Sequence, residues 1–499
     1  MSRSKAPRRT IRFLINDDTV ELADVRPDQT VLDWLRLERR LVGTKEGCAE
    51  GDCGACTVLV GRLSGGTLIY ESVNACIRFL ATLDGCHLVT IEHLRGHNGR
   101  LHPVQQAMVD FHGSQCGFCT PGFVMSLYAL WMREPWPDGR AIETALQGNL
   151  CRCTGYDAIV KAAKQISTYG VAADCELAAE RGRATDALLE LRDGRRVEIG
   201  EGKQRLILPG SVADLAAVLE EEPGARIVAG STDVGLWVTK FMRDISPAVF
   251  IGHLDRLKGI SEKDGVLTIG AGVTYTEARE AIAARIPSLG RLIDRIGGEQ
   301  VRNMGTIGGN IANGSPIGDT PPPLIALGAT LTLRKGDTTR TIPLEEFFIA
   351  YGQQDRQPGE FVEAVHVPLP PAGAHVAFHK VTKRRDEDIT ATLGAFVIET
   401  DSAGKVTTAR IAYGGMAATP KRASAVEAAL VGKAWSMETV EAAIASFDAD
   451  FTPLSDMRAS AEYRMMVAKN LLKRFYLETT GTDRPITVVR ERATGERAA

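Results

Sequence analysis

The N-terminal part of the chain alternates apolar and polar positions, as the strands of a half-buried sheet do. Residues 11–15 and 20–22 alternate on either side of a turn at Asn16-Asp17-Asp18, which predicts a β-hairpin. A helix capped by Thr30 is predicted to run through Arg40, followed by a strand at Thr57–Val60 and a second hairpin around Gly65-Gly66. Residues 8–92 therefore predict a small α+β domain.

Helical spacing of the apolar side chains replaces this alternation further along the chain. It recurs in four segments, which are residues 104–111, 121–132, 142–146 and 158–166. Residues 93–170 therefore predict a four-helix domain. The charged and weakly apolar residues 171–204 predict a linker that is partly helical.

Two further domains are predicted on either side of Pro368-Leu369-Pro370-Pro371. Residues 205–370 contain a helix capped at Ser211 and a buried strand at 226–228, in the manner of an α/β domain. Residues 374–482 place strands before helices, which predicts an α+β domain. The expected strands are 376–381, 393–398 and 409–413, and the expected helices are 424–430, 437–446 and 459–476. The mixed-sign run Lys383–Asp388 is typical of a solvated turn.

Eight of the ten cysteines fall into two sets of four, which is the strongest chemical signal in the chain. The first set reads Cys48-x4-Cys53-x2-Cys56, with Cys76 further on. This is the spacing of plant-type [2Fe–2S] ferredoxins, in which four thiolates complete two tetrahedral irons. The second set reads Cys116-x2-Cys119 and then Cys151-x-Cys153. Structural zinc is the alternative, more plausible for the second set than for the first, whose loop is rich in glycine. Together the two sets favour two clusters.

Two glycine-rich segments in residues 205–370 suggest a bound ligand. The first, Ile227–Val234, runs from a buried strand into a polar turn, where backbone N–H groups are free to bind a pyrophosphate. The second, Gly305–Asp319, is dominated by glycine and small polar residues, a composition that permits close approach of backbone to ligand. An ordinary strand and turn remains the alternative for each, and neither segment matches the Rossmann G-x-G-x-x-G pattern.

The composition excludes several classes of function. A net charge of −3 leaves no basic surplus for nucleic acid, and no apolar run reaches the ~20 residues of a membrane helix. Too few apolar residues follow Arg8-Arg9 for an export signal, so we expect a cytoplasmic protein. Cys86 and Cys175 lie outside both sets and are predicted to be structural. The nine histidines show no metal-ligand spacing.

With these motifs assembled, the chain resembles the iron–sulfur and flavin subunits of bacterial xanthine dehydrogenases, in the molybdenum hydroxylase family. The resemblance covers nearly the whole length and rests on GCAEGDCGACTV, QCGFCTPG, NLCRCTGY, VAGSTDVG and GGNIANGSPIGD, in that order. It implies an α+β multidomain protein. The implied domains are a β-grasp plant-type ferredoxin domain, a four-helix second [2Fe–2S] domain, an α/β FAD-binding domain of the PCMH type and an α+β C-terminal flavoprotein domain.

The resemblance also implies which residues bind the cofactors. One cluster would be held by Cys48, Cys53, Cys56 and Cys76, and the other by Cys116, Cys119, Cys151 and Cys153. FAD would contact Ile227, Val228, Ala229, Gly230, Ser231, Thr232, Asp233, Val234, Ile296, Thr306, Asp319 and, by a loose alignment, Lys421. Ile296 stands where the family often has an aromatic ring against the flavin. The Lys383–Asp388 run lies, in the family, near the nicotinamide side of the flavin.

The implied activity is electron transfer without a catalytic side chain on this chain. Electrons from a molybdenum centre that oxidises hypoxanthine or xanthine to urate would pass through both clusters to FAD and on to NAD+. The molybdopterin cofactor would lie on a large partner subunit only, in a heterotetramer with two copies of each chain. Three alternatives stay open: a molybdenum hydroxylase for aldehydes or heteroaromatic compounds, a self-sufficient NADH:acceptor reductase, and a zinc-stabilised scaffold.

Overall fold

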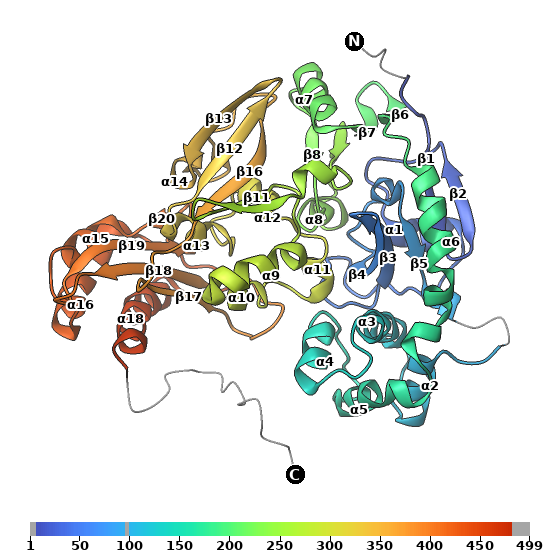
Figure 1. Cartoon of the computed structure of the whole chain (residues 1–499), viewed down its shortest axis with the longest axis horizontal. Coiled ribbons are helices and arrows are strands. Elements are labelled where there is room, and N and C mark those ends of the chain that lie inside the picture. The colour runs from blue at the N-terminus through green and yellow to red at the C-terminus, as the bar shows by residue number, and fades with distance from the viewer. Residues whose placement is uncertain (1–5, 95–98, 482–499) are drawn as a thin grey trace.

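The computed structural model describes residues 6–94 and 99–481. The N-terminal sheet lies at the right of Figure 1, with a group of short helices below it. The C-terminal unit lies at the far left, and the two sheets of residues 197–368 lie between these ends. The molecule is thus a row of packed units, with the middle of the chain in contact with both the N-terminal and the C-terminal parts.

The N-terminal unit is a five-stranded mixed sheet in the order β2-β1-β5-β3-β4, the arrangement expected of a β-grasp ferredoxin domain. Its apolar alternation buries Ile11, Phe13 and Ile15 against the helical segment after Thr30. Thr30 caps that segment as predicted, accepting a hydrogen bond from Asp33 N. The strands and helices are β1 (Ile11–Ile15), β2 (Asp18–Leu22), α1 (Val31–Asp33), a π turn (Trp34–Glu38), β3 (Thr57–Ser64), β4 (Thr67–Asn74), β5 (His87–Val89) and two 3-10 turns (Leu80–Leu83 and Ile91–Leu94).

The second unit consists of four short helices, as the helical spacing predicted. The longest of them is almost entirely buried and packs on β3 and β4. Trp131 and Tyr128 are among its largest buried side chains. The helices are α2 (Pro103–Asp110), α3 (Thr120–Arg133), α4 (Gly139–Leu146) and α5 (Asp157–Gln165), followed by a 3-10 turn at Ile166–Thr168.

The segment expected to be a linker is more ordered than its composition suggests. A 3-10 turn (Ala172–Asp174) leads into α6 (Glu176–Leu191), which runs beside β1 in Figure 1 and buries Leu177 and Leu188. His93 lies between Asp17 and Glu180 and ties this helix to the N-terminal sheet. The segment then forms β6 (Val197–Glu201), which pairs with the next strand, so that sheet begins before residue 205. The alternation of the buried residues Val197 and Ile199 is too short to indicate a strand among the many charged residues of this segment.

Residues 197–368 form two sheets with helices between them. The first has the order β6-β7-β9-β8, with β7, β9 and β8 parallel, and the second has the order β10-β11-β16-β12-β13 and is antiparallel. The first sheet and its helices are β7 (Gln204–Leu208), α7 (Val212–Glu221), β8 (Arg226–Val228), α8 (Val234–Thr239), β9 (Ala248–Phe250) and a 3-10 turn (Asp255–Leu257). The second part comprises β10 (Ile260–Lys263), β11 (Val266–Gly270), α9 (Tyr275–Arg285), α10 (Pro287–Ile293), α11 (Glu299–Arg302), α12 (Ile307–Asn313), α13 (Pro321–Ala326), β12 (Thr330–Lys335), β13 (Thr338–Pro343), α14 (Leu344–Phe347), β14 (Phe348–Ala350), β15 (Gln353–Gln354) and β16 (Phe361–Pro368).

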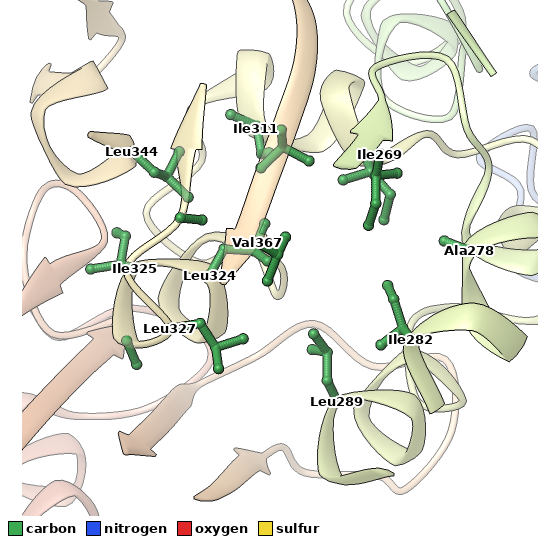
Figure 2. Packing of buried hydrophobic residues seen from close by; sticks show 14 of the residues in the cluster. Ile269, Ala278, Ile282, Leu289, Ile311, Leu324, Ile325, Leu327, Leu344 and Val367 are labelled. Carbon is green, nitrogen blue, oxygen red and sulfur yellow. The ribbon is translucent and has the colours of Figure 1, made fainter. Parts of the chain in front are cut away.

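The largest apolar core lies in this second part and is shown in Figure 2. Ile282 and Leu289 from α9 and α10 point toward Ile269 on β11 and Val367 on β16, and Leu324 comes from α13. Burying a side chain of this kind contributes about 1.5–3 kcal/mol. This core is the rigid support for the glycine-rich segment that α12 carries.

The C-terminal unit has the strands-then-helices order that the sequence predicted. Its sheet has the order β17-β18-β19-β20, and the long C-terminal helix covers one face of it. The elements are β17 (His375–Val381), β18 (Thr392–Thr400), β19 (Val406–Gly414), β20 (Lys421–Arg422), α15 (Ser424–Leu430), α16 (Met437–Ile444), α17 (Phe447–Asp450) and α18 (Ala461–Thr480). The predicted end of this domain, residue 482, lies outside the described residues. None of the helices in the described ranges has the length and apolar character needed to cross a membrane.

Candidate functional site

The first cysteine set converges at one edge of the N-terminal sheet. Cys48, Cys53 and Cys56 lie on the loop before β3, and Cys76 lies in the turn after β4. The thiols of Cys53 and Cys76 hold the pKa of Cys48 far below its ordinary value, and the thiol of Cys48 raises the pKa of both partners. Cys56 acts on Cys76 in the same way. Such mutual effects require neighbouring sulfur atoms, so the four cysteines form one donor set.

The backbone around these thiols fits an iron–sulfur cluster. The N–H groups of Glu50 and Cys53 donate to Cys48 Sγ at 3.5 and 3.4 Å. A Cβ added at Gly47 would lie 2.8 Å from Cys53 Sγ, and one at Gly54, whose φ is +66°, would lie 2.0 Å from the Gly148 carbonyl oxygen. N–H···S hydrogen bonds of this kind tune cluster potentials.

The second set also converges, at the ends of short helices. The Cys119 thiol pairs with that of Cys151, and the Cys153 thiol pairs with that of Cys116. Burial raises the pKa of Cys119 to about 12, with Cys151 adding to the effect. Thr154 stabilises Cys151 Sγ through its N–H at 3.4 Å and its hydroxyl at 3.1 Å. Cys119 lies immediately before a helix start, as the N-cap of α3.

The two sets are neighbours in space although they are far apart in the sequence. Leu150 N donates to the Cys53 carbonyl oxygen at 2.9 Å. Asn149 Nδ2 donates to the Gly54 carbonyl oxygen at 3.2 Å, across 95 positions of the chain. The first of these bonds is a main-chain contact between the segments that carry the two sets. A direct backbone link of this kind fixes the separation of the two sulfur sites.

The first glycine-rich segment lies between β8 and α8. Ser231 has a left-handed backbone with φ +57° and accepts a hydrogen bond from Gly235 N at 2.7 Å. A Cβ at Gly230 would lie 1.8 Å from the Met304 carbonyl oxygen, so this turn packs directly on the second segment. Burial raises the pKa of Asp233, which precedes α8. The structure therefore brings Ile227–Val234 together with the residues just before Thr306.

The second glycine-rich segment begins α12 and has an unsatisfied polar atom. Thr306 caps the helix by accepting a hydrogen bond from Gly309 N at 3.0 Å. A Cβ at Gly308 would lie 2.4 Å from Ala271 Cβ. Asn310 Oδ1 is buried and has no hydrogen-bond partner among the described residues. A buried polar atom of this kind is expected to meet a ligand, so the residues present fit a bound dinucleotide such as FAD.

Asp319 has a cationic partner that sequence reasoning missed. Lys380 Nζ lies 2.6 Å from Asp319 Oδ2, and the Lys380 side chain is almost fully buried. Asp319 also shares a small cavity with Ile296, which places these two predicted flavin contacts together. The sequence does indicate that Lys380 is buried, because it alternates with Val376 and Phe378 on one face of a predicted strand.

Lys421 is the predicted residue that the structure separates from the others. Its Nζ donates to the Asp450 carbonyl oxygen at 2.7 Å and lies 5.7 Å from the Phe451 ring centre, inside the C-terminal unit. The structure therefore does not bring Lys421 together with the other predicted flavin contacts. Lys380 is the lysine that lies beside Asp319.

The Lys383–Asp388 run is only partly the solvated turn that its charges suggested. Arg384 and Arg385 are exposed, but Glu387 is half-buried. Its burial raises its pKa to about 9, and the nearby Asp52 carboxyl adds to the effect. Gln147 Nε2 donates to Asp386 Oδ1 at 3.0 Å. The loop therefore contacts both cysteine-bearing domains.

Four family models match successive parts of the chain. Residues 13–78 match the 2Fe-2S iron-sulfur cluster binding domain, and residues 90–164 match the [2Fe-2S] binding domain. Residues 201–370 match the FAD binding domain in molybdopterin dehydrogenase, and residues 377–479 match the CO dehydrogenase flavoprotein C-terminal domain. This chain belongs to the molybdenum hydroxylase family. As a member of that family, it contains two iron–sulfur domains and an FAD-binding domain, and the expected fold class is confirmed.

Individual relatives within the molybdenum hydroxylase family differ in the activity they are named for. A xanthine dehydrogenase of Emericella nidulans is 31% identical over 97% of this chain and 40% of its own length. Aldehyde oxidase 1 of Oryctolagus cuniculus is 30% identical over 95% of this chain and 40% of its own length. The chain thus spans about two fifths of these relatives. A solved carbon monoxide dehydrogenase chain from Hydrogenophaga pseudoflava is 31% identical, with a TM-score of 0.51 over 54% of this chain and 93% of that chain.

Proposed function

We propose that this chain is the electron-transfer subunit of a xanthine dehydrogenase. Electrons released when hypoxanthine or xanthine is oxidised to urate on a partner chain would pass through two [2Fe–2S] clusters to FAD and on to NAD+. When bound, these cofactors supply the electron-carrying chemistry. The observation that carries the proposal is the hydrogen-bonded contact between two four-cysteine sets in a chain that also contains an FAD-binding domain. The similarity to a xanthine dehydrogenase over 97% of the chain supports the choice of substrate.

The side chains of this subunit hold and position the cofactors, and none is assigned as a catalytic acid or base. Cys48, Cys53, Cys56 and Cys76 would bind one cluster, and Cys116, Cys119, Cys151 and Cys153 would bind the other. The flavin nucleotide would lie against Ile227–Val234, Thr306 and Asp319, with Ile296 beside the ring. We add Lys380 to this set because it neutralises the buried Asp319 carboxylate.

Both cysteine-bearing domains touch the unit that carries the flavin segments, so the order of the two clusters in the electron path is inferred from the contacts of the cysteine-bearing loops themselves. The loop of the first set contacts the unit that carries the flavin segments, since Thr239 Oγ1 donates to the Ala49 carbonyl oxygen at 2.7 Å and Lys240 Nζ donates to that of Cys48. The second set reaches the first through Leu150 and Cys53. We therefore infer that electrons enter at the second set, pass to the first and then reach the flavin.

We also propose that a partner covers the surface around the second set. Cys116 and Cys153 are exposed, and the large apolar side chains Phe118 and Leu150 next to the cysteines of this set are exposed as well. Exposed apolar groups beside a redox site suit a partner interface. The proposed partner is a large molybdopterin-binding subunit, in a cytoplasmic heterotetramer with two copies of each chain.

A molybdenum hydroxylase for aldehydes is the second candidate, because aldehyde oxidase 1 of Oryctolagus cuniculus is about as similar to this chain. The deciding experiment is to co-express the chain with the molybdopterin-binding subunit of the same organism and to assay the purified complex. We expect xanthine-dependent reduction of NAD+, with little turnover of benzaldehyde. Preference for aldehydes would select the second candidate, and transfer to oxygen in place of NAD+ would correct the acceptor. Full NADH-to-dye turnover by the chain alone would favour a self-sufficient reductase.

A further inference from the structure

A cavity of about 440 Å³ lies between the N-terminal sheet, the connection from α6 to β6 and the sheet of β6–β9. Three of its walls are residues 208–212, 229–231 and 250–255, which follow the parallel strands β7, β8 and β9. The carboxyl ends of parallel strands are the usual place for a ligand in an open α/β sheet. The volume is also in the range of small-molecule sites, about 300–1,000 Å³.

Arg78 and Lys258 line this cavity and make no ion pair in the described part of the chain, although Glu71 lies near Arg78, and Glu277 and Asp255 lie near Lys258. Arg78 Nε is buried without a hydrogen bond, and Arg78 Nη2 makes only a long contact of 3.5 Å with the Thr82 carbonyl oxygen. Lys258 is largely enclosed and makes no ion pair within these described ranges. Burial lowers the pKa of both groups. A buried charge without a partner is costly, so these two groups are suited to an anion.

Two other cations of the cavity wall, Arg62 and Arg8, contrast with Arg78 and Lys258. Arg62 pairs with Glu71 at 2.8 Å and with Glu277 at 2.7 Å, and Arg8 pairs with Asp84 at 2.7 Å. Their charges are therefore balanced within the protein. Arg78 and Lys258 both lie close enough to the Cys86 thiol to act on its pKa, which burial raises. Arg78, Lys258 and Cys86 all line this cavity, so the two cations without an ion pair lie near the same part of its wall.

Part of the remaining wall is apolar, which suits a ligand with an organic body. Val60, Leu208, Phe250, Leu254 and Met304 line the cavity. His253 Nε2 donates to the Pro209 carbonyl oxygen at 2.6 Å, so its Nδ1 is left as an acceptor. An inorganic phosphate ion is only a few times the size of a water molecule, which occupies about 30 Å³. It would therefore fill only a small part of 440 Å³.

The cavity is distinct from the space around Ile296 and Asp319. Those two predicted flavin contacts line a separate small cavity with Thr320. The large cavity shares only Ala229–Ser231 and Thr306 with the predicted FAD segments. An occupant of the large cavity would therefore lie against the loops that are proposed to bind FAD.

We propose that this cavity binds an organic monophosphate of up to nucleotide size, with Arg78 and Lys258 holding its phosphate. The site is additional to the cofactors of the proposed function. Its ligand touches the Ala229–Ser231 turn, which we assign to FAD, so the experiment must separate the two nucleotides.

The test uses the full chain loaded with FAD and clusters, with AMP, adenosine and inorganic phosphate as probes in equilibrium dialysis. We expect one AMP per chain, with adenosine and inorganic phosphate each at least about tenfold weaker. Arg78→Met and Lys258→Met should each weaken AMP binding by about tenfold or more while FAD content stays unchanged. Lys263→Met, an exposed lysine on β10, is the matched control and should bind AMP as the wild type does.

Four results would overturn the proposal. These are no saturable AMP binding, AMP binding that both variants retain, inorganic phosphate binding as tightly as AMP, and loss of FAD from Lys258→Met. The last result would show that the cavity belongs to FAD itself. The Lys258→Met variant keeps the test informative if the Arg78 variant fails to fold. Lys258 makes no ion pair in the described residues that its loss would break. Failure of the cluster and flavin assignment would instead appear in the iron and flavin content of the wild type.

Discussion

Gln300 donates a hydrogen bond to Asn149 Oδ1 at 2.9 Å. Gln300 lies on α11, beside the glycine-rich segments, and Asn149 lies shortly before Cys151 in the chain. The same Nε2 lies 3.2 Å from Thr57 Oγ1 and 3.1 Å from Ser126 Oγ, and Gln300 is fully buried. One amide therefore joins both cysteine-bearing domains to the domain that binds FAD.

Replacing Gln300 with Leu should destabilise the contact between these three domains. The change leaves buried polar groups of Thr57, Ser126 and Asn149 without this partner, at a cost of about 1–3 kcal/mol. The expected result is a lower midpoint of thermal unfolding, followed by calorimetry. Gln353→Leu, at an exposed position on β15, is the control. An unchanged midpoint for the Gln300 variant would show that the network adds no stability.

Replacing Cys151 with Ala should remove one cluster while FAD stays bound. Three thiolates cannot complete two tetrahedral irons, so one of two [2Fe–2S] signals in paramagnetic resonance should disappear. Cys175→Ala is the matched control, because Cys175 is also buried and lies outside both sets, where it accepts a hydrogen bond from Tyr128 at 3.3 Å. Two intact signals in the Cys151 variant would refute the ligand assignment.

Lys380→Met and Lys421→Met separate the two candidate lysines of the flavin site. Loss of Lys380 leaves the buried Asp319 without its cation, a change that typically costs about 3–5 kcal/mol in broken buried pairs, so flavin content should fall. The Lys421 amino group contacts Asp450 and Phe451 of the C-terminal unit, and its variant should keep its flavin. The visible absorbance of the bound flavin provides the measurement. The opposite ranking would restore Lys421 and remove Lys380 from the site.

The imidazole of His87 should make the protein sensitive to mild acid. It donates from Nε2 to the Asn16 carbonyl oxygen and accepts from the Tyr70 hydroxyl, both at 2.8 Å, and burial lowers its pKa to about 4. The unfolded chain takes up this proton below about pH 6.5, whereas the folded chain does not, so stability falls as the pH drops from about 6.5 toward about 4. At pH 5.5 the loss is roughly 1.4 kcal/mol.

Unfolding midpoints between about pH 7.5 and 5.5 test this expectation. His87→Gln cannot take up a proton and should show a flatter pH dependence, even though its stability near neutral pH is lower. His112→Gln, at an exposed position, should keep the slope of the wild type. Equal slopes for the wild type and the His87 variant would mean that another group governs the acid sensitivity.

Local patterns predicted much of the fold, because hairpins, caps and helices depend on neighbouring residues. The strand pattern at residues 11–15, the Thr30 cap and the helix at 424–430 are confirmed by the structure. The strand β6 was missed because only two buried residues alternate within a charged segment. Strand pairing is a long-range contact, and the periodicity of one segment does not reveal its partner.

The residues of the candidate site also divide into those that local patterns predict and those that depend on long-range contacts. Cysteine spacing is a local pattern, and it predicted two sets that the structure brings together. The pairing of Asp319 with Lys380 joins residues 61 positions apart, and motif alignment chose Lys421 in its place. The Gln300 network likewise depends on how three domains pack, which no single motif specifies.

The central claim is that this chain carries two iron–sulfur clusters and one flavin. The most direct measurement is the content of iron, acid-labile sulfide, zinc and FAD in protein purified without oxygen. The account predicts about four irons, four sulfides and one FAD per chain, with a brown colour. A colourless protein that contains zinc, without sulfide or flavin, would contradict it.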